Sequence, residues 1–283
     1  MKIVGVGLGL IGGSMLLSLR QIESESEFFG IDTNTIHLRE ALDLQIIDQQ
    51  AEDKDFADAD VVVVSIPVDI SPQVIQDTLD KVGEKTLVID TGSTKENICK
   101  FLATHPKRDQ FLATHPIAGT EFSGPKAAYA QLFKAKTMIL CEIEKTRFQL
   151  QEIAIGLFEK MQMKIRYMHP KDHDQHIAYV SHLSHISSFM LGKTVIEKEQ
   201  DQQDIFDLAG SGFASTVRLA KSHPQTWTSI FKDNKAEVLE ALNHYIKNLE
   251  SFQKTLQNDE YQLLYQEMNH TNQLKGILKG IKS

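Results

Sequence analysis

The segment that most constrains the fold is a glycine-rich turn close to the N-terminus. It lies in KIVGVGLGLIGGSMLLSL (2–19), where an apolar run from Lys2 to Val6 predicts a β-strand and the pattern after the turn predicts a helix. The turn itself, Gly7-Leu8-Gly9-Leu10-Ile11-Gly12, has the spacing G-x-G-x-x-G. Glycine allows the chain to reverse this tightly between a strand and a helix that pack together, so we expect a unit of strand, turn and helix here.

The positions of the three glycines predict a dinucleotide-binding turn. Gly7 permits the turn, Gly9 lets a pyrophosphate approach the backbone, and Gly12 lets the helix pack closely on the strand. The N–H groups at the start of the helix, among them those of Leu10 and Ile11, lack intrahelical partners and favour phosphate together with the helix dipole. We therefore predict that these five residues bind the phosphates of a dinucleotide.

Asp32 supports this interpretation and indicates which dinucleotide binds. It ends a second predicted strand, FFGID (28–32), 20 residues after Gly12. A carboxylate at this place binds the ribose 2′-hydroxyl of NAD and repels the 2′-phosphate of NADP, and no arginine directly follows it. We therefore predict NAD as the cofactor in preference to NADP. The alternative is a glycine-rich turn in an unrelated α/β protein, but it does not account for the order of strand, turn, helix and carboxylate.

Alternating strand and helix patterns continue as far as Met168. The segment ADVVVVSIP (59–67) contains four consecutive valines, which predict a strand buried on both faces of a sheet. Such alternation predicts a mostly parallel sheet wrapped by helices, that is, an α/β fold of the Rossmann type. Further strands are predicted at 86–93, 111–115, 137–143 and 163–168, with helices at 93–105 and about 147–161.

The character of the sequence changes after His169-Pro170. From there to the end no stretch resembles a strand, and helical patterns are broken near 210–212, at Pro224 and near 258–259. We therefore predict two domains, an α/β Rossmann-type domain over 1–169 and an all-α domain over 170–283.

Composition and charge restrict the partners and the compartment. Of the 283 residues 41% are hydrophobic and 24% charged, as in soluble globular proteins, and a net charge of -8 without a basic run argues against nucleic acid. Two cysteines, Cys99 and Cys141, suit a reducing compartment. The apolar N-terminus is interrupted by five glycines, and Arg20 follows without a small-residue cleavage site, unlike a signal peptide. We expect a cytoplasmic protein that does not bind membranes.

Two histidines share the local sequence LATHP. His105 lies at the predicted end of a helix, before Pro106, where a histidine interacts favourably with the helix C-terminus without any catalytic role. His115 lies at the predicted end of a strand, and ligands of open α/β sheets bind beyond the carboxyl ends of the strands. We therefore predict that His115 is the catalytic histidine.

Ser93, in DTGSTK (90–95), follows the preceding predicted strand and belongs to the same edge of the sheet. A serine at this place also fits a helix N-cap, with Glu96 three residues on completing a capping box. A capping serine can still present its hydroxyl, so the structural and the catalytic interpretations both stay open.

The segment HPKDHDQHIAYVSHLSHISSF (169–189) holds five histidines. Their spacings resemble metal-binding motifs, but Pro170 places His169 outside the helix and no cysteine lies nearby, so we predict no metal site. Asp174 precedes His185 by eleven residues, or three helical turns, which predicts a shared face for substrate binding. A polar helix face at a domain boundary is the alternative.

Arg218 is the candidate for binding an acidic substrate. Gly210 and Gly212 predict the end of one helix, and Arg218 lies on the next, short one. Arginine binds a carboxylate through two parallel hydrogen bonds, which suits a substrate with acid groups. A surface or helix-pairing arginine is the alternative.

Five stretches of the chain together resemble the prephenate/arogenate dehydrogenase family of tyrosine biosynthesis. The third and the fourth are far more specific than the glycine motif. In chain order the stretches are GVGLGLIGGS (5–14), DTGSTK (90–95), HPIAGTEFSG (115–124), HDQHIAYVSHLSH (173–185) and GSGFASTVRLAKSHPQTW (210–227). The resemblance implies oxidation of a cyclohexadienol by NAD with loss of the ring carboxylate as CO₂, and a homodimer formed through the C-terminal helices.

The resemblance also implies roles for single residues. His115 accepts the proton of the ring hydroxyl as the hydride leaves, which suits an imidazole that is neutral near pH 7. Ser93 hydrogen-bonds the same region, and Arg218 and His185 hold the acid groups of the substrate. We expect Arg218 to bind mainly the side-chain carboxylate, because the carboxylate that leaves should not be held tightly in the ground state.

Three more residues take roles from the resemblance. Thr120 and Glu121 line the entrance, and Asp174 orients the helix that carries the histidines. The sequence departs from the family pattern at Ser215, where relatives carry an aspartate three residues before the arginine. An ion pair made by that aspartate is therefore in doubt in this chain.

Three alternatives to a prephenate dehydrogenase stay open. Arogenate differs from prephenate only in its side chain, which the sequence does not distinguish. A β-hydroxyacid dehydrogenase or an imine reductase would carry a catalytic lysine early on the helix that joins the domains, whereas here Lys193 lies far along it. A non-enzymatic NAD-binding redox sensor would leave His115, His185 and Arg218 unexplained.

Overall fold

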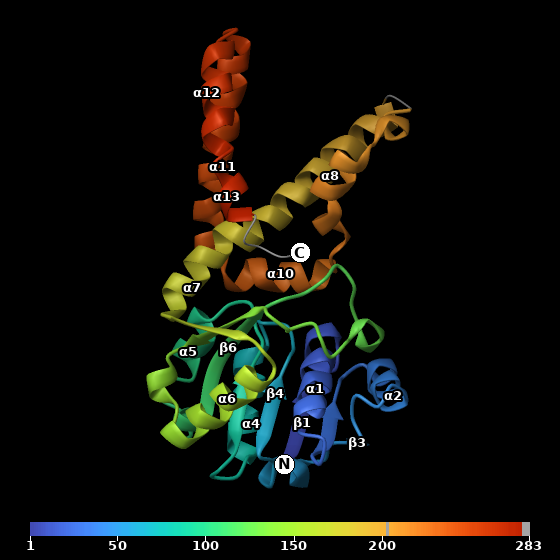
Figure 1. Ribbon diagram of the computed structural model, residues 1–283, viewed down its shortest axis with the longest axis vertical. Helices are drawn as coiled ribbons and strands as arrows, with labels where there is room; N and C mark the ends of the chain where they lie inside the picture. Colours follow the sequence, from blue (N-terminus) through green and yellow to red (C-terminus); the bar gives the residue numbers. More distant parts are fainter. Residues whose placement is uncertain (202–203, 279–283) are drawn as a thin grey trace. The chain divides into compact units, whose positions relative to one another are not determined.

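The computed structural model describes residues 1–201 and 204–278 (Figure 1). Its strands are β1 (Lys2–Val6), β2 (Glu27–Ile31), β3 (Gln49–Gln50), β4 (Val61–Val64), β5 (Leu87–Asp90), β6 (Phe111–Ile117), β7 (Thr137–Cys141) and β8 (Lys164–Met168). Its α-helices are α1 (Leu10–Ile22), α2 (Thr35–Asp43), α3 (Asp53–Ala57), α4 (Ser71–Lys81), α5 (Glu96–Phe101), α6 (Phe148–Lys160), α7 (Pro170–Ile177), α8 (Leu183–Asp201), α9 (Ser211–Thr216), α10 (Pro224–Asp233), α11 (Lys235–Gln257), α12 (Tyr261–Thr271) and α13 (Leu274–Leu278).

The eight strands form one sheet in the order β3-β2-β1-β4-β5-β6-β7-β8. All neighbouring strands run parallel except β6 and β7, which pair antiparallel. The first six strands have the order of a doubly wound dinucleotide-binding fold, in which β1 and β4 flank the switch point. The predicted α/β fold with a mostly parallel sheet is confirmed.

The four valines of β4 explain why this strand lies at the centre of the sheet. Val61 and Val63 belong to the core on the face covered by α1 and α6, whereas Val62 and Val64 belong to the core on the face covered by α4 and α5. Each is at most 1% exposed, and burying one such side chain contributes about 1.5–3 kcal/mol. The predicted burial on both faces is therefore confirmed.

Strand β6 extends beyond its neighbour in the parallel part of the sheet. It pairs with β5 only at Phe111 and Leu112, and from Ala113 to Ile117 it pairs antiparallel with β7. The prediction that the strand ends at His115 is therefore wrong, because β7 continues to pair with β6 for two further residues. His115 instead lies inside the part of β6 that has passed the end of its pairing with β5.

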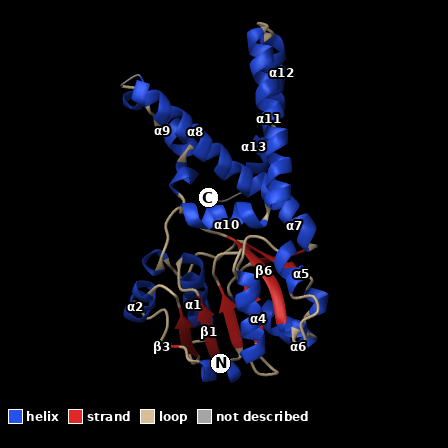
Figure 2. Cartoon of the chain, turned by 180° about the vertical axis from the view of Figure 1, so that it is seen from behind, coloured by secondary structure: helices blue, strands red, loops and turns tan. Residues whose placement is uncertain are grey.

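The regular elements described after Met168 are all helical (Figure 2). Helix α7 continues through a π-helical turn, Ala178–His182, into α8. Gly210 is the N-cap of α9, whereas Gly212 lies inside this helix, so the prediction that both glycines end a helix is wrong. The residues that the structure describes contain no helix long and apolar enough to cross a membrane.

The chain divides into two compact units, Met1–Lys235 and Ala236–Ser283. The first contains the sheet and helices α1 to α10, and the second contains α12, α13 and nearly all of α11. The domain boundary at 169/170 stays a prediction. The last five residues of the predicted helical domain, 279–283, lie outside the described residues.

Candidate active site

The glycine turn between β1 and α1 fits the approach of a phosphate. Gly7 has φ +87°, and a Cβ there would lie 2.2 Å from the carbonyl oxygen of Ser65. A Cβ on Gly12 would lie 2.0 Å from the carbonyl oxygen of Gly7, whereas the space beside Gly9 is open to 4 Å. Gly9 is the N-cap of α1, with no side-chain cap and no acidic residue in the first turn. The start of α1 can therefore accept an anion.

Asp32 is held beside this turn by the backbone. Its Oδ2 accepts a hydrogen bond from the amide of Leu8 at 2.9 Å, and its Oδ1 accepts one from the amide of Asn34 at 2.8 Å. The Nδ1 atom of His37 lies 3.7 Å from Oδ2. These contacts place a carboxylate immediately next to the glycine turn, where the ribose of a dinucleotide would lie.

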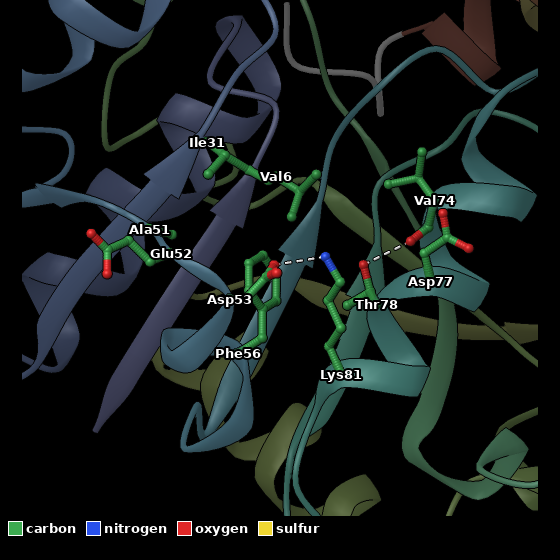
Figure 3. A pocket seen from close by; sticks show the side chains of 10 residues that line it. All are labelled: Val6, Ile31, Ala51, Glu52, Asp53, Phe56, Val74, Asp77, Thr78 and Lys81. Carbon is green, nitrogen blue, oxygen red and sulfur yellow. Dashed lines mark hydrogen bonds and ion pairs between the residues drawn. The ribbon is translucent and has the colours of Figure 1, made fainter.

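A pocket of about 310 Å³ opens next to the residue before Asp32 (Figure 3). Val6 and Ile31, the last residues of β1 and β2, line it together with Phe56 and the side of α4. At its rim Lys81 pairs with Asp53 at 2.7 Å. The candidate catalytic residues His115 and Ser93 do not line this pocket, so it is not the place of the proposed reaction.

His115 is 9% exposed and makes a side-chain contact that the sequence does not predict. Its Nδ1 lies 2.8 Å from Nε2 of His173, the fourth residue of α7. Burial holds the pKa of His115 well below the usual 6.5, and the neighbouring titratable side chains His173, Lys95 and His182 lower it further. His115 is therefore a neutral imidazole near pH 7, which is the form that accepts a proton.

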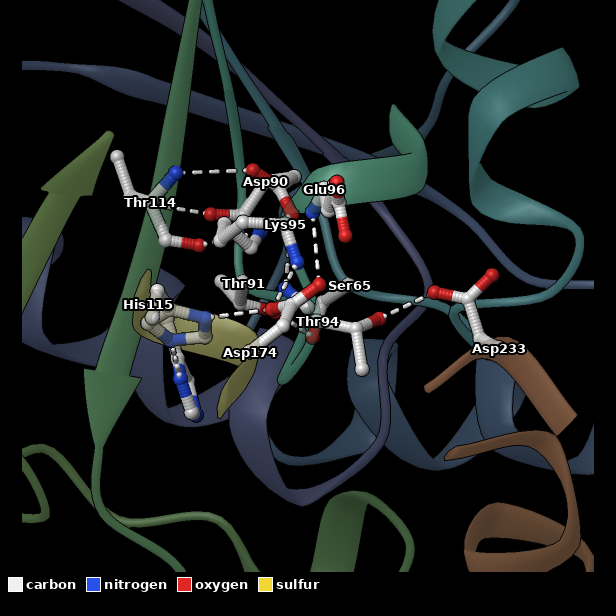
Figure 4. A network of polar contacts seen from close by, with 12 residues as sticks. Ser65, Asp90, Thr91, Thr94, Lys95, Glu96, Thr114, His115, Asp174 and Asp233 are labelled. Carbon is white, nitrogen blue, oxygen red and sulfur yellow. Dashed lines mark hydrogen bonds and ion pairs between the residues drawn. The ribbon is translucent and has the colours of Figure 1, made fainter. Parts of the chain in front are cut away.

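Asp174 joins α7 to the start of α5. Its carboxylate accepts hydrogen bonds from the backbone amides of Lys95 at 2.7 Å and Glu96 at 2.8 Å (Figure 4). The N-cap residue of α5 is Lys95, which makes no side-chain cap. The predicted capping box of Ser93 and Glu96 is therefore wrong, because a carboxylate from a distant helix takes the place of the serine. The hydroxyl of Ser93, which is half-buried, is not committed to capping.

A buried ion pair fixes the backbone next to His115. The ammonium group of Lys95 pairs with the carboxylate of Asp90 and donates a hydrogen bond to the carbonyl oxygen of Thr114 at 2.8 Å. Asp90 also accepts the amide hydrogen of Thr114 at 2.9 Å. Both charged side chains are almost fully buried, so each depends on the other. Both residues belong to the stretch DTGSTK. Opposite charges at and just after the end of a buried strand are the feature by which the sequence could have indicated this ion pair.

His182 and His185 both meet Trp227, which lies on α10. The ring of His185 stacks on the indole, and the ring of His182 meets it edge-on at 5.9 Å between centroids. Burial lowers the pKa of His185, and it lowers that of the fully buried His182 to about 4. Asn234 donates from Nδ2 to the carbonyl oxygen of Asp174 at 2.8 Å and lies 3.3 Å from Nδ1 of His182.

The predicted shared face of Asp174 and His185 does not hold. A π-helical turn, Ala178–His182, lies between them and changes the helical repeat, so three α-helical turns no longer separate the two residues. Asp174 is directed to the start of α5, whereas His185 stacks on Trp227 and its Nδ1 donates to the carbonyl oxygen of Ser181 at 3.0 Å.

Arg218 and Glu121 form an ion pair with 3.2 Å between Nη1 and Oε2. The Arg218 side chain is 52% exposed, and the backbone amide of Glu121 together with the ion pair lowers the pKa of the Glu121 carboxyl. Thr120 accepts a hydrogen bond from the amide of Phe122 at 3.2 Å, and Ser215 donates to the carbonyl oxygen of Gly212 at 2.9 Å. The loop after β6 therefore reaches the segment that carries Arg218.

His105 takes part in none of these contacts. It lies in the turn after α5, where its Nδ1 accepts a hydrogen bond from the amide of Lys107 at 3.1 Å and its Nε2 lies 3.3 Å from Asp80. The helix predicted to end at His105 ends at Phe101, but a structural role for this histidine agrees with its contacts.

Both parts of the chain match one protein family. Residues 16–167 match the family described as "Prephenate dehydrogenase, nucleotide-binding domain", and residues 169–270 match "Prephenate dehydrogenase, dimerization domain". The prephenate dehydrogenase of Bacillus subtilis (strain 168) is 27% identical over 267 residues, which cover 92% of this chain and 71% of the relative.

Solved structures with the same fold cover almost the whole chain. The crystal structure of prephenate dehydrogenase from A. aeolicus in complex with hydroxyphenyl propionate and NAD+ has a TM-score of 0.89 at 29% identity, and covers 98% of each chain. The structure of Synechocystis arogenate dehydrogenase has a TM-score of 0.78 at 25% identity, with 98% of this chain and 100% of that chain covered.

Proposed function

Because the chain belongs to the prephenate dehydrogenase family, we propose that it converts prephenate and NAD into 4-hydroxyphenylpyruvate, CO₂ and NADH in tyrosine biosynthesis. The observation that carries this proposal is that His115 is a buried, neutral imidazole. It lies in the part of β6 that extends beyond the pairing of this strand with β5. Oxidation of a ring carbinol needs a base of this kind within reach of the hydroxyl. The chain is an enzyme of this family. What we propose in addition is that its dinucleotide is NAD and its substrate is prephenate.

The glycine turn and Asp32 would hold NAD. In the proposal Gly7, Gly9 and Gly12 let the pyrophosphate approach the start of α1, and Asp32 binds the ribose hydroxyls. The pocket beside Ile31 would receive the adenine ring. When bound, the nicotinamide accepts the hydride that leaves the substrate ring.

His115 would remove the hydroxyl proton of the substrate. In the proposed reaction the carbon–hydrogen electron pair leaves as hydride and the hydroxyl proton goes to the imidazole. The bond to the ring carboxylate then breaks, CO₂ leaves, and the electron pair of that bond completes the aromatic ring, while the resulting phenolate oxygen takes the proton back from the imidazole. Ser93, whose hydroxyl is not used as a helix cap, would hydrogen-bond the same region.

Arg218 and His185 would hold the acid groups of prephenate, and Thr120 and Glu121 would line the entrance. Support comes from the Arg218–Glu121 ion pair, because a guanidinium already paired with a carboxylate on an exposed surface can exchange it for a substrate carboxylate. Asp174 would orient the histidine-bearing helix through its bonds to the start of α5.

The chain contains the dimerisation domain of the family, and we propose a homodimer through its C-terminal helices. Support comes from α11 and α12, which leave a set of large apolar side chains exposed. Its members are Leu239, Ile246, Leu249, Phe252, Leu256, Tyr261, Leu263, Tyr265 and Met268. A monomer at micromolar concentration in sedimentation velocity would contradict this part of the proposal.

The state of the two cysteines supports a cytoplasmic location, which we propose. Both are free and buried, and burial raises the pKa of both thiols, that of Cys141 to about 12. Thiols in this state are rarely ionised and do not form disulfides readily, and cytoplasmic proteins keep their thiols reduced.

The first experiment is to measure NADH or NADPH formation by the purified protein with prephenate or arogenate, each with NAD and with NADP. Turnover with prephenate and NAD is the expected result. Turnover with arogenate alone would keep His115 as the base and change the substrate. If no pair is turned over although NAD binds, a β-hydroxyacid is offered next: its oxidation would favour that class of dehydrogenase, and no oxidation would favour a redox sensor.

A further inference from the structure

Three buried side chains form a continuous polar chain that ends at His115. The Nδ1 atom of His115 lies 2.8 Å from Nε2 of His173, and Nδ1 of His173 lies 2.7 Å from Oδ1 of Asp174. The exposed fractions are 9%, 2% and 3% in the same order, so water cannot replace any of these contacts. His173 has no role in the proposed function.

The direction of the hydrogen bonds follows from the Asp174 end. Both carboxylate oxygens already accept hydrogen bonds from backbone amides, Oδ1 from Lys95 and Oδ2 from Glu96. The carboxylate is therefore an acceptor throughout, and the proton between it and His173 sits on Nδ1 of the imidazole. A neutral His173 with a proton on Nδ1 has a bare Nε2, which can only accept.

His115 must then donate to His173. If Nδ1 of His115 were also bare, two lone pairs would face each other at 2.8 Å, so the proton of the neutral His115 ring sits on Nδ1. Its Nε2 is left without a proton and is the basic atom of the ring. The other titratable groups close to His115 are Lys95 and His182, which disfavour a second proton on the ring.

We infer that His173 is a positioning residue for the oxidation: anchored by Asp174, it fixes His115 in the tautomer whose Nε2 accepts the substrate proton. This inference rests on the proposed function, in which His115 is the base. When Nε2 takes up a proton, Nδ1 remains a donor to His173, so nothing in the network has to reverse during the reaction. The negative charge of Asp174 then stabilises the imidazolium through His173.

The tautomer can be observed without turnover. In protein labelled with ¹⁵N in histidine, long-range ¹⁵N–¹H correlation spectra distinguish a ring protonated on Nδ1 from one protonated on Nε2. At neutral pH we expect His115 and His173 both to carry the proton on Nδ1, with signals identified from their loss in His115→Asn and His173→Gln. A His115 ring protonated on Nε2 in the wild-type protein would overturn the inference, whatever substrate the enzyme uses.

Two substitutions of His173 separate positioning from packing. The glutamine of His173→Gln places a polar atom where Nε2 stood, within reach of His115, whereas the asparagine of His173→Asn replaces Nδ1 and reaches only Asp174. We expect kcat to fall about 10²- to 10⁴-fold in His173→Asn, as for a wrong tautomer. In His173→Gln the decrease in kcat should be smaller by a factor of about ten or more. KM and the Kd for NAD should change little in either variant.

His176→Asn is the matched control, because His176 is exposed on the same helix. Its kinetics should equal those of the wild type. Equal losses in the two His173 variants would show that His173 acts through packing, and wild-type activity in His173→Asn would remove it from the reaction. If the wild-type protein turns over no substrate, the proposed function fails, and the tautomer spectra still decide whether His173 fixes His115.

Discussion

Trp227 stacks on the imidazole of His185 with ring centroids 3.4 Å apart and ring planes 22° apart. Trp227 is the single tryptophan of the chain, so intrinsic indole fluorescence reports on this contact. His182 meets the same indole edge-on, and both histidines lie on the helical segment that continues from α7. The fluorescence of one residue therefore follows two histidines of the candidate site.

Trp227 fluorescence should titrate in two steps on the acid side of pH 6.5. Protonated imidazole quenches indole, and burial lowers the pKa of His185 below 6.5 and that of His182 to about 4. We expect constant emission from neutral pH down to about 6.5, a first loss below it, and a second near 4. The first step should disappear in His185→Gln, and a first step above pH 6.5 would contradict the effect of burial.

Substitution of the predicted base should affect turnover alone. His115→Asn should lower kcat about 10²- to 10⁴-fold and leave the Kd for NAD unchanged, because in the proposed reaction the imidazole acts on the substrate hydroxyl and the glycine turn binds the dinucleotide. His105→Asn is the matched control, since it changes the same LATHP sequence at a position beside Asp80. Steady-state kinetics and NAD titration measure both, and near-normal turnover in His115→Asn would remove it as the base.

The pH profile of kcat/KM follows from the lowered pKa of His115. The base acts in its neutral form, so the rate is full above the pKa of the folded protein and is lost as the pH falls through it. Burial places this pKa well below 6.5. We expect kcat/KM to stay level from about pH 8 to 6.5 and to decline only in more acid solution. An acid limb centred at or above 6.5 would show that His115 is solvated or is not the titrating base.

Arg218→Ala should weaken substrate binding and leave the fold intact. Loss of a charge-assisted contact should raise KM about 10- to 100-fold, with a smaller change in kcat. Its pair with Glu121 is half-exposed, so the Tm should not change measurably. Arg218→Lys keeps the charge but not the two parallel hydrogen bonds, so its KM should lie between that of the wild type and that of Arg218→Ala. An unchanged KM in Arg218→Ala would exclude contact with the substrate.

Removal of the Asp32 carboxylate should change the preference between dinucleotides. Asp32→Ala should raise KM for NAD by about tenfold and lower it for NADP, because the charge that repels a 2′-phosphate is gone. Asp43→Asn, an exposed carboxylate at the end of α2, removes the same charge elsewhere and should leave both KM values unchanged. An unaltered ratio of the two KM values in Asp32→Ala would show that another residue selects the cofactor.

The sequence predicts those parts of the site that depend on local pattern. The glycine turn, Asp32 and the valines of β4 are recognisable because strand and helix periods and the needs of a tight turn are set by neighbouring residues. The preference for His115 over His105 needs only the order of strand and helix. Each of these features is set by a short stretch of the chain, so it can be recognised without knowledge of how distant elements pack.

The sequence does not predict contacts that depend on where distant elements pack. Asp174 caps α5 across 79 positions, and the capping box that Ser93 and Glu96 suggest is displaced by it. The π-helical turn at Ala178–His182 changes the helical repeat, so spacing arguments across it fail. His173 is one of five histidines in a polar stretch, and only its distance to His115 distinguishes it.

The bonds from Asp174 to Lys95 and Glu96 also set an order of assembly during synthesis. The glycine turn, Asp32 and His115 all leave the ribosome before His173 and Asp174 have been translated. Until α7 has reached α5, the first amides of α5 lack their acceptor and the ring of His115 lacks the partner that selects its tautomer. In a nascent chain the partners of His115 are therefore complete only after α7 has been made, and a polypeptide that stops before residue 173 carries His115 without the side chain that would fix its tautomer.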